Sequence, residues 1–204
     1  LIVIDFKQNM GSKGSFNRNY LRMKKLFTAI LAIMIAAPSV LNAQAKVSEE
    51  KNVLKVNTLS LIFGTGSIFY ERAITDAMSA QLGVAYLNYK FDNAKFSGLI
   101  LTPEARFYVK KNAIDGFYVG PYLRYQNFKL EDTVDQDEAS YTNYGGGFVF
   151  GRQWITNSGF TMDLFFGGHY GSGKISADDG VDNWGSPPFE GFSTRIGFAL
   201  GFAF

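Results

Sequence analysis

The side chains with the clearest chemical potential are charged residues within stretches where large apolar residues alternate with small or polar ones. They are three acids and three bases: Glu71, Glu104, Arg106, Arg124, Asp163 and Arg195. If the alternation points them into one interior, they must be paired or hydrated, because an isolated buried charge is too costly to keep. Two interpretations stay open: a gated pore or proton path, and a salt-bridged plug that holds the interior rigid.

His169 is the only histidine of the chain, and Tyr170, Gly171 and Ser172 follow it. This run loosely resembles the site of membrane-barrel enzymes that deacylate lipid A, which use a histidine with a nearby serine and a carboxylate. In a strand, however, Ser172 points to the face opposite His169 unless a bulge intervenes. The sequence therefore assigns no catalytic residue, and His169 is interpreted as a candidate polar site in the lumen.

Metal, cofactor and nucleic-acid sites find no support in the sequence. The acidic segment 178–183 lacks the spaced ligands and the closing Glu of a calcium loop. The chain has no Cys, which excludes thiolate metal sites, a Cys nucleophile and disulfides. Its net charge is +2 with acids and bases interspersed, so no basic stripe indicates nucleic acid. We expect no metal, no cofactor and no nucleic-acid partner.

Period-two alternation dominates residues 53–204 and predicts β-strands. At the end of the chain, Phe198, Leu200 and Phe202 share one face, and the other face is small or polar. A soluble sheet would bury the large residues, whereas a narrow membrane barrel turns them to lipid. The alternating stretches lie near 53–63, 66–74, 77–90, 98–110, 116–128, 141–154, 159–170 and 192–204. Each is close to the length of about 9–11 residues that a transmembrane strand requires.

The facing of the first of these stretches is open, because either Leu54, Val56 and Thr58 or Leu59, Leu61 and Phe63 would suit lipid. Two cations, Arg72 and Arg152, fall on outward positions near the periplasmic end of their strands, where long side chains can snorkel. Aromatic residues near strand ends suit interfacial belts. These are Tyr125, Phe128, Trp154 and Tyr170.

The connections between these stretches test the topology independently, since outer-membrane barrels have short periplasmic turns and longer outer loops. Three alternate connections are short and turn-like, at 75–76, 111–115 and 155–158. The connections at 129–140 and 171–191 are longer and acidic, although the one at 64–66 is tight. The sequence thus predicts an all-β fold, an eight-stranded antiparallel up-and-down transmembrane β-barrel.

An export signal precedes the predicted barrel. A positive start at 23–25, an apolar run at 26–37 and the small-x-small motif Ala43-Gln44-Ala45 indicate a cleaved signal peptide over 23–45. The apolar run is shorter than the roughly 20 residues of a membrane helix, which is the alternative. Residues 1–22 are interpreted as an upstream extension from a mis-called start, and 46–204 as the barrel. The expected location is the bacterial outer membrane.

The last ten residues resemble the C-terminal signal of outer-membrane barrels, which ends in Phe after alternating apolar residues. The resemblance implies that Phe198, Leu200, Phe202 and Phe204 form an assembly signal that the barrel-assembly machinery reads. The segments 53–57, 70–72 and 120–122 resemble the small outer-membrane barrels of Bacteroidota gathered as a domain of unknown function. The architecture is similar to that of outer-membrane proteins A and X.

Two classes of function remain open from the sequence. The first is a non-enzymatic outer-membrane barrel that contributes to envelope integrity or presents surface loops for binding. The alternative is a lipid A-modifying barrel enzyme or a narrow channel. In either case we expect a monomer whose partners are outer-membrane lipids and, during insertion, the barrel-assembly machinery.

Overall fold

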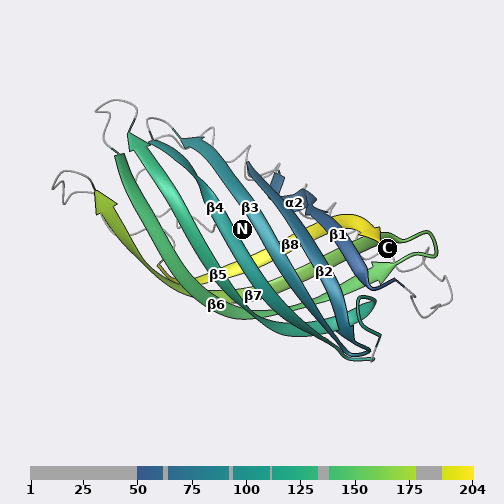
Figure 1. Cartoon of the computed structure of the whole chain (residues 1–204). Helices are drawn as coiled ribbons and strands as arrows, with labels where there is room; N and C mark the ends of the chain where they lie inside the picture. The colour runs from purple at the N-terminus through teal and green to yellow at the C-terminus, as the bar shows by residue number, and fades with distance from the viewer. Residues whose placement is uncertain (1–49, 62–63, 92–93, 111, 133–137, 178–189) are drawn as a thin grey trace, which may run out of the picture. The chain divides into compact units, whose positions relative to one another are not determined.

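Eight strands form one closed antiparallel sheet in this computed structural model (Figure 1). Each strand pairs with its neighbours in sequence, and the last closes onto the first. The strands are β1 (Asn52–Asn57), β2 (Thr65–Thr75), β3 (Met78–Phe91), β4 (Ala94–Tyr108), β5 (Gly116–Asp132), β6 (Glu138–Ile155), β7 (Phe160–Ala177) and β8 (Gly191–Ala203). The structure describes residues 50–61, 64–91, 94–110, 112–132, 138–177 and 190–204. The predicted upstream extension and signal peptide lie outside the described residues.

The two ends of the barrel differ in their connections. Strands β2 and β3, β4 and β5, and β6 and β7 are joined at one end, through residues 76–77, 109–115 and 156–159. This is also where β1 begins and β8 ends, and we call it the short-turn end and the opposite one the loop end. The predicted loops at 129–140 and 171–191 are too long, since β5 runs to Asp132, β6 starts at Glu138 and β7 runs to Ala177. Backbone pairing continues through these polar segments because it does not depend on side-chain polarity.

The first strand is shorter than the predicted stretch 53–63, which was wrong beyond Asn57. A single helical turn, α2 (Thr58–Leu61), follows it. Asn57 caps this turn: its Oδ1 accepts a hydrogen bond from the Ser60 amide, and its carbonyl accepts one from Ser60 Oγ. The sequence allowed either of two sets of residues in this stretch to face lipid. The structure agrees with the set that contains Leu54 and Val56, which are both exposed on the outer face. No helix in the described residues has the length and apolarity needed to cross a membrane.

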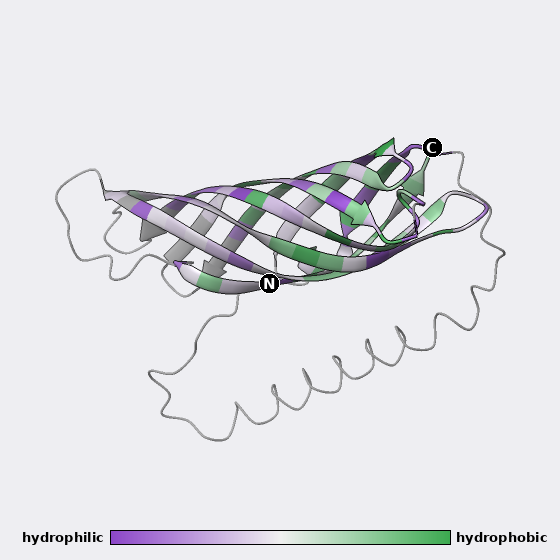
Figure 2. Cartoon of the chain, turned by 90° about the horizontal axis from the view of Figure 1, so that it is seen from below, coloured by the Kyte–Doolittle hydropathy of each residue, from purple (hydrophilic) through white to green (hydrophobic). Residues whose placement is uncertain are grey.

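The outer wall is apolar and the interior polar, the reverse of a water-soluble protein. Side chains such as Leu123 and Phe148 are 67% and 68% exposed, whereas Glu71, Arg106 and Asp163 are fully buried. Figure 2 shows the polar and apolar residues alternating along the strands. An apolar outer surface is stable in contact with lipid hydrocarbon. Hydrocarbon cannot hydrogen-bond the backbone groups of an open sheet edge, and a closed barrel has no such edge, so this barrel suits a bilayer. The predicted fold class, an eight-stranded transmembrane β-barrel, is confirmed.

Most of the outward positions follow the predicted parity. Arg72 is exposed, and the Arg152 guanidinium lies 4.5 Å from the Phe117 ring centroid and 5.1 Å from that of Trp154. Phe128 is the exception, because it is 1% exposed rather than interfacial. It stacks on buried Tyr141, with 6.4 Å between the ring centroids. Phe128 points inward because it shares its parity with the inward residues of β5.

Candidate functional site

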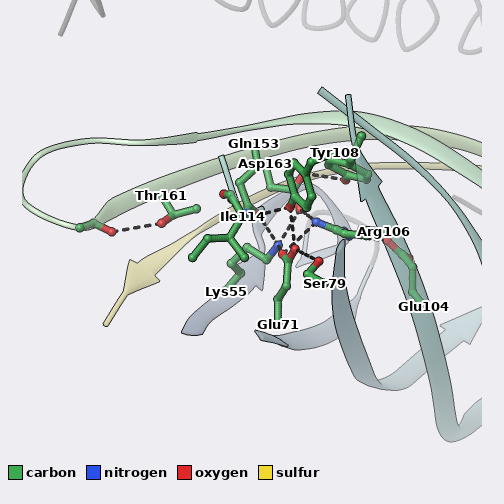
Figure 3. A network of polar contacts seen from close by, with 12 residues as sticks. Lys55, Glu71, Ser79, Glu104, Arg106, Tyr108, Ile114, Gln153, Thr161 and Asp163 are labelled. Carbon is green, nitrogen blue, oxygen red and sulfur yellow. Dashed lines mark hydrogen bonds and ion pairs between the residues drawn. The ribbon is translucent and has the colours of Figure 1, made fainter. Parts of the chain in front are cut away.

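The most organised site is a polar network inside the barrel, here called the lumen network (Figure 3). Its members are inward-facing and buried, and every strand contributes at least one of them. They are Lys55 (β1), Glu71 (β2), Ser79 (β3), Glu104, Arg106 and Tyr108 (β4), Tyr118 (β5), Gln153 (β6), Asp163 (β7) and Arg195 (β8). Strand pairing sets their common level, with Ser79 beside Arg106 and Gln153 beside Asp163 in the register.

Arg106 lies at the centre of the lumen network. Its Nε is 2.6 Å from Glu104 Oε1, and its Nη1 is 2.8 Å from Asp163 Oδ2 and 3.1 Å from Glu71 Oε2. Its guanidinium carbon also lies 4.0 Å from the centroid of the Tyr118 ring. One buried guanidinium therefore binds three carboxylates from three strands, the role for which its rigid fork of donors is suited.

Lys55 is a second cation that bridges the carboxylates. Its Nζ lies 2.6 Å from Glu71 Oε2 and 2.8 Å from Asp163 Oδ2, and it donates a hydrogen bond to Gln153 Oε1. Lys55 was not among the residues predicted from the sequence to form a site. The available signal was its position between Leu54 and Val56, which places it inward once those two face lipid.

The remaining carboxylate oxygens are also satisfied. Glu71 Oε1 accepts hydrogen bonds of 2.6 Å from both Ser79 Oγ and Tyr108 OH. Tyr118 OH donates to Asp163 Oδ1 at 2.8 Å, and Arg195 Nη1 donates to Glu104 Oε2 at 2.6 Å. Three cations (Lys55, Arg106, Arg195) thus face three anions (Glu71, Glu104, Asp163), and the network is formally neutral. Each of the six charges has an opposite charge within ion-pair distance, which is what permits them in a buried interior, although Nη2 of Arg106 and of Arg195 has no hydrogen-bond partner among the described residues.

Arg124 is the one member of the predicted charge cluster that the structure leaves outside this network. Its guanidinium lies 5.7 Å from the Tyr122 ring centroid, and no carboxylate of the described residues is within ion-pair distance. Its Nε has no hydrogen-bond partner among them. Arg124 points inward, yet it is two residues farther toward the loop end than Tyr122, which pairs with Glu104.

His169 lies in the lumen but is not arranged as a catalytic base. It is 2% exposed and stacks on Tyr122, with the ring centroids 6.1 Å apart. Neither ring nitrogen has a hydrogen-bond partner within the described part of the chain. The β6–β7 register runs unbroken from Ala139 to Ile155, so no bulge turns Ser172 inward, and Ser172 is exposed.

An apolar plug lies beside the network at the short-turn end. Ile114 is fully buried and packs with Val53 and Ala203, and its carbonyl accepts a hydrogen bond of 2.7 Å from Gln153 Nε2. Its φ is 68°, a left-handed conformation that is rare for a β-branched residue. The surrounding packing holds this strained backbone in place.

Comparison with protein families shows to which family the chain belongs. A family model described as "Protein of unknown function (DUF3575)" matches residues 29–178. The chain belongs to this family. Its membership matches the resemblance to a domain of unknown function, whereas the link to Bacteroidota stays a prediction.

Comparisons with individual proteins add little to the DUF3575 assignment. A major outer membrane protein from Thermus thermophilus is similar in structure, with a TM-score of 0.48 and 12% identity. The similarity covers 77% of this chain and 100% of that one. No curated protein matches the sequence. In the described residues, no group of three or more His, Asp or Glu is placed to hold a metal ion.

Proposed function

We propose that this DUF3575 protein is a non-enzymatic barrel of the bacterial outer membrane that contributes to envelope integrity and is closed to passive flow. The observation that carries the proposal is the lumen network, whose neutral set of ion pairs joins five strands and whose hydrogen bonds from Ser79, Tyr118 and Gln153 bring in the other three. A barrel of eight strands has an interior just wide enough to be filled by side chains. Here that interior holds paired charges at one level and the Ile114 plug beside them.

The geometry favours a closed barrel over the narrow channel and the lipid A-modifying enzyme. A continuous path past the lumen network would have to separate Arg106 and Lys55 from their carboxylates, which leaves buried charges without partners. An enzyme centred on His169 would need a nucleophile hydrogen-bonded to its ring. Ser172 lies on the other face, and Ser193, the register partner of His169 on β8, makes no hydrogen bond to either ring nitrogen. The other part of the prediction, binding through surface loops, concerns segments 133–137 and 178–189, which lie outside the described residues.

Conductance and lipid chemistry test this proposal together. The purified barrel in a planar bilayer should give no stable conductance steps, because side chains are enough to fill the interior of an eight-stranded barrel and this one holds the paired lumen network. Mass spectrometry should find the same lipid A in cells with and without the protein. Cells that lack it should take up more of a hydrophobic dye, and the wild-type protein should reverse this. Stable conductance would point to a channel, altered lipid A to an enzyme, and unchanged dye uptake would contradict the role in the envelope.

Export and assembly form part of the same proposal. The protein recovered from outer membranes should begin at Lys46, which N-terminal sequencing measures. The assembly signal is proposed to be read through Phe198, Leu200, Phe202 and Phe204, and Phe204 is 61% exposed at the short-turn end. A Phe204→Ala variant keeps the backbone bonds between Phe204 and Asn52. It should therefore fold in detergent yet reach the outer membrane in lower yield. Retention of residues 23–45, or a normal yield for the variant, would contradict the respective signal.

A further inference from the structure

The outer wall of the barrel is hollowed across β2, β3, β4 and β5. The hollow has a volume of about 650 Å³, and its lining is almost entirely apolar. This falls within the range of about 300–1,000 Å³ that small-molecule sites occupy. Outward residues of the four strands line it, including Ala80, Leu82, Pro103, Ala105, Pro121 and Leu123. It opens on the lipid-facing side of the wall, although its lining also includes the inward residues Gln81, Glu104 and Tyr122, so that Glu104 of the lumen network borders it.

Short side chains and prolines account for the hollow. Ala80 and Ala105 face each other across the β3–β4 pair, where other outward positions carry large residues. Pro103 and Pro121 each lack a backbone N–H, and residues 102–103 and 105–106 of β4 have no partner in β5. Proline inside a paired sheet is uncommon, because it removes a hydrogen bond of the ladder. The outward side chains are therefore shorter here than around the hollow, and the backbone of β4 and β5 has fewer paired residues.

A cation borders this apolar surface. Arg72 lines the hollow, is exposed and pairs in register with Ala80. No carboxylate of the described residues lies within ion-pair distance of its guanidinium. An Arg on the lipid face is costly away from the interface, and a phosphate is an anion that its planar fork can bind through two hydrogen bonds. Arg72 lies toward the short-turn end of β2, where the headgroups of one leaflet are within reach.

We infer that the hollow binds one glycerophospholipid, whose phosphate is held by Arg72 and whose acyl chain lies along Ala80, Ala105 and the two prolines. Lipid hydrocarbon is the medium in contact with this wall, so an acyl chain fills the hollow without desolvating any polar group. The phosphate supplies the charge that Arg72 lacks within the protein. The apolar floor and the single cation thus match the two parts of one amphipathic molecule.

Native mass spectrometry of the full barrel released from detergent micelles tests the role of Arg72. With palmitoyl-oleoyl phosphatidylglycerol as the probe, the wild type should bind one lipid molecule. Arg72→Gln should bind it about tenfold more weakly, the loss expected for one charge-assisted contact. Arg152→Gln is the matched control, since Arg152 is also outward but lies over Phe117 and Trp154, outside the hollow. Equal losses in the two variants would overturn the site.

A second pair of variants tests the acyl-chain half. Ala105→Phe should fill the hollow and weaken binding, while Val119→Phe adds the same ring to an exposed position of β5 outside it and should not. Dioleoylglycerol, which has acyl chains but no phosphate, should bind weakly to the wild type and equally to Arg72→Gln. If it binds as tightly as the phospholipid, or if Ala105→Phe binds normally, the inference is wrong. Heat-modifiable migration confirms that each variant is folded before it is compared.

Discussion

Replacing Arg106 by Met should lower the free energy of unfolding in detergent by about 3–5 kcal/mol, the usual cost of removing one partner of a buried ion pair. The substitution leaves Glu71, Glu104 and Asp163 with one cation fewer in a lumen where their side chains are fully buried. Lys55 still contacts Glu71 and Asp163, and Arg195 still contacts Glu104, so each carboxylate keeps one of its two cations. Urea unfolding in detergent micelles, followed by tryptophan fluorescence, measures the change.

Arg124→Met is the matched control for this prediction. Arg124 also points into the lumen, but it makes no ion pair with the described residues, so its loss should cost about 1 kcal/mol or less. From the sequence alone, the two arginines had equal weight. Equal destabilisation by the two substitutions would show that the lumen responds to charge in general and not to the specific pairs of the lumen network.

Placing an arginine at Phe148 should destabilise the barrel by about 2–4 kcal/mol, because this position faces the hydrocarbon near the bilayer midplane. Phe148 is 68% exposed on β6. On the same strand and face it lies midway between Arg152, near the short-turn end, and Tyr144, toward the loop end. Both of those residue types suit a membrane interface. Urea unfolding in lipid vesicles measures the cost.

Tyr144→Arg supplies the comparison of depth. It changes an outward residue of the same strand that is 64% exposed, and it should cost only about 0–1 kcal/mol near the interface. Tyr144 also packs on Tyr125, with ring centroids 5.1 Å apart, so part of any loss reflects that contact. Equal costs at the two depths, or folding of either variant without detergent or lipid, would contradict the membrane assignment.

The strands were predictable because side chains in a strand alternate between two faces, and a barrel in lipid makes those faces differ. That signal does not fix where a strand ends. It missed the end of β1 at Asn57, because the residues after it continue an apolar pattern within α2. The signal also disappears in the acidic segment 129–140, so the ends of β5 and β6 were predicted as a loop, although Glu131 and Glu138 still pair through their backbones.

The candidate site was predictable in its facing but not in its pairing. Alternation was enough to point Arg106 and Arg124 to the same side of the wall. How far along the barrel each arginine lies depends on the register between strands. That register pairs Glu104 with Tyr122, so Arg124 lies two residues farther toward the loop end than Glu104. The contacts also join residues far apart in the chain, as Lys55 and Asp163 are separated by 108 positions. No local pattern encodes such a pair.

The line along which the sheet closes on itself has an unusual distribution of stabilising contacts. The ladder between β1 and β8 runs only from Val53 to Asn57, with the Asn52–Phe204 backbone bonds at its end, whereas the ladder between β5 and β6 runs from Gly116 to Glu131 of β5. Lys55 lies in the middle of this short ladder, and its two carboxylate partners come from opposite directions around the ring: Glu71 from adjacent β2, and Asp163 from β7 by way of β8. An unclosed sheet leaves Lys55 with half of its counter-charge. Closing the ring and neutralising that lysine are consequently one event, and the charge makes partly open forms of the barrel costly.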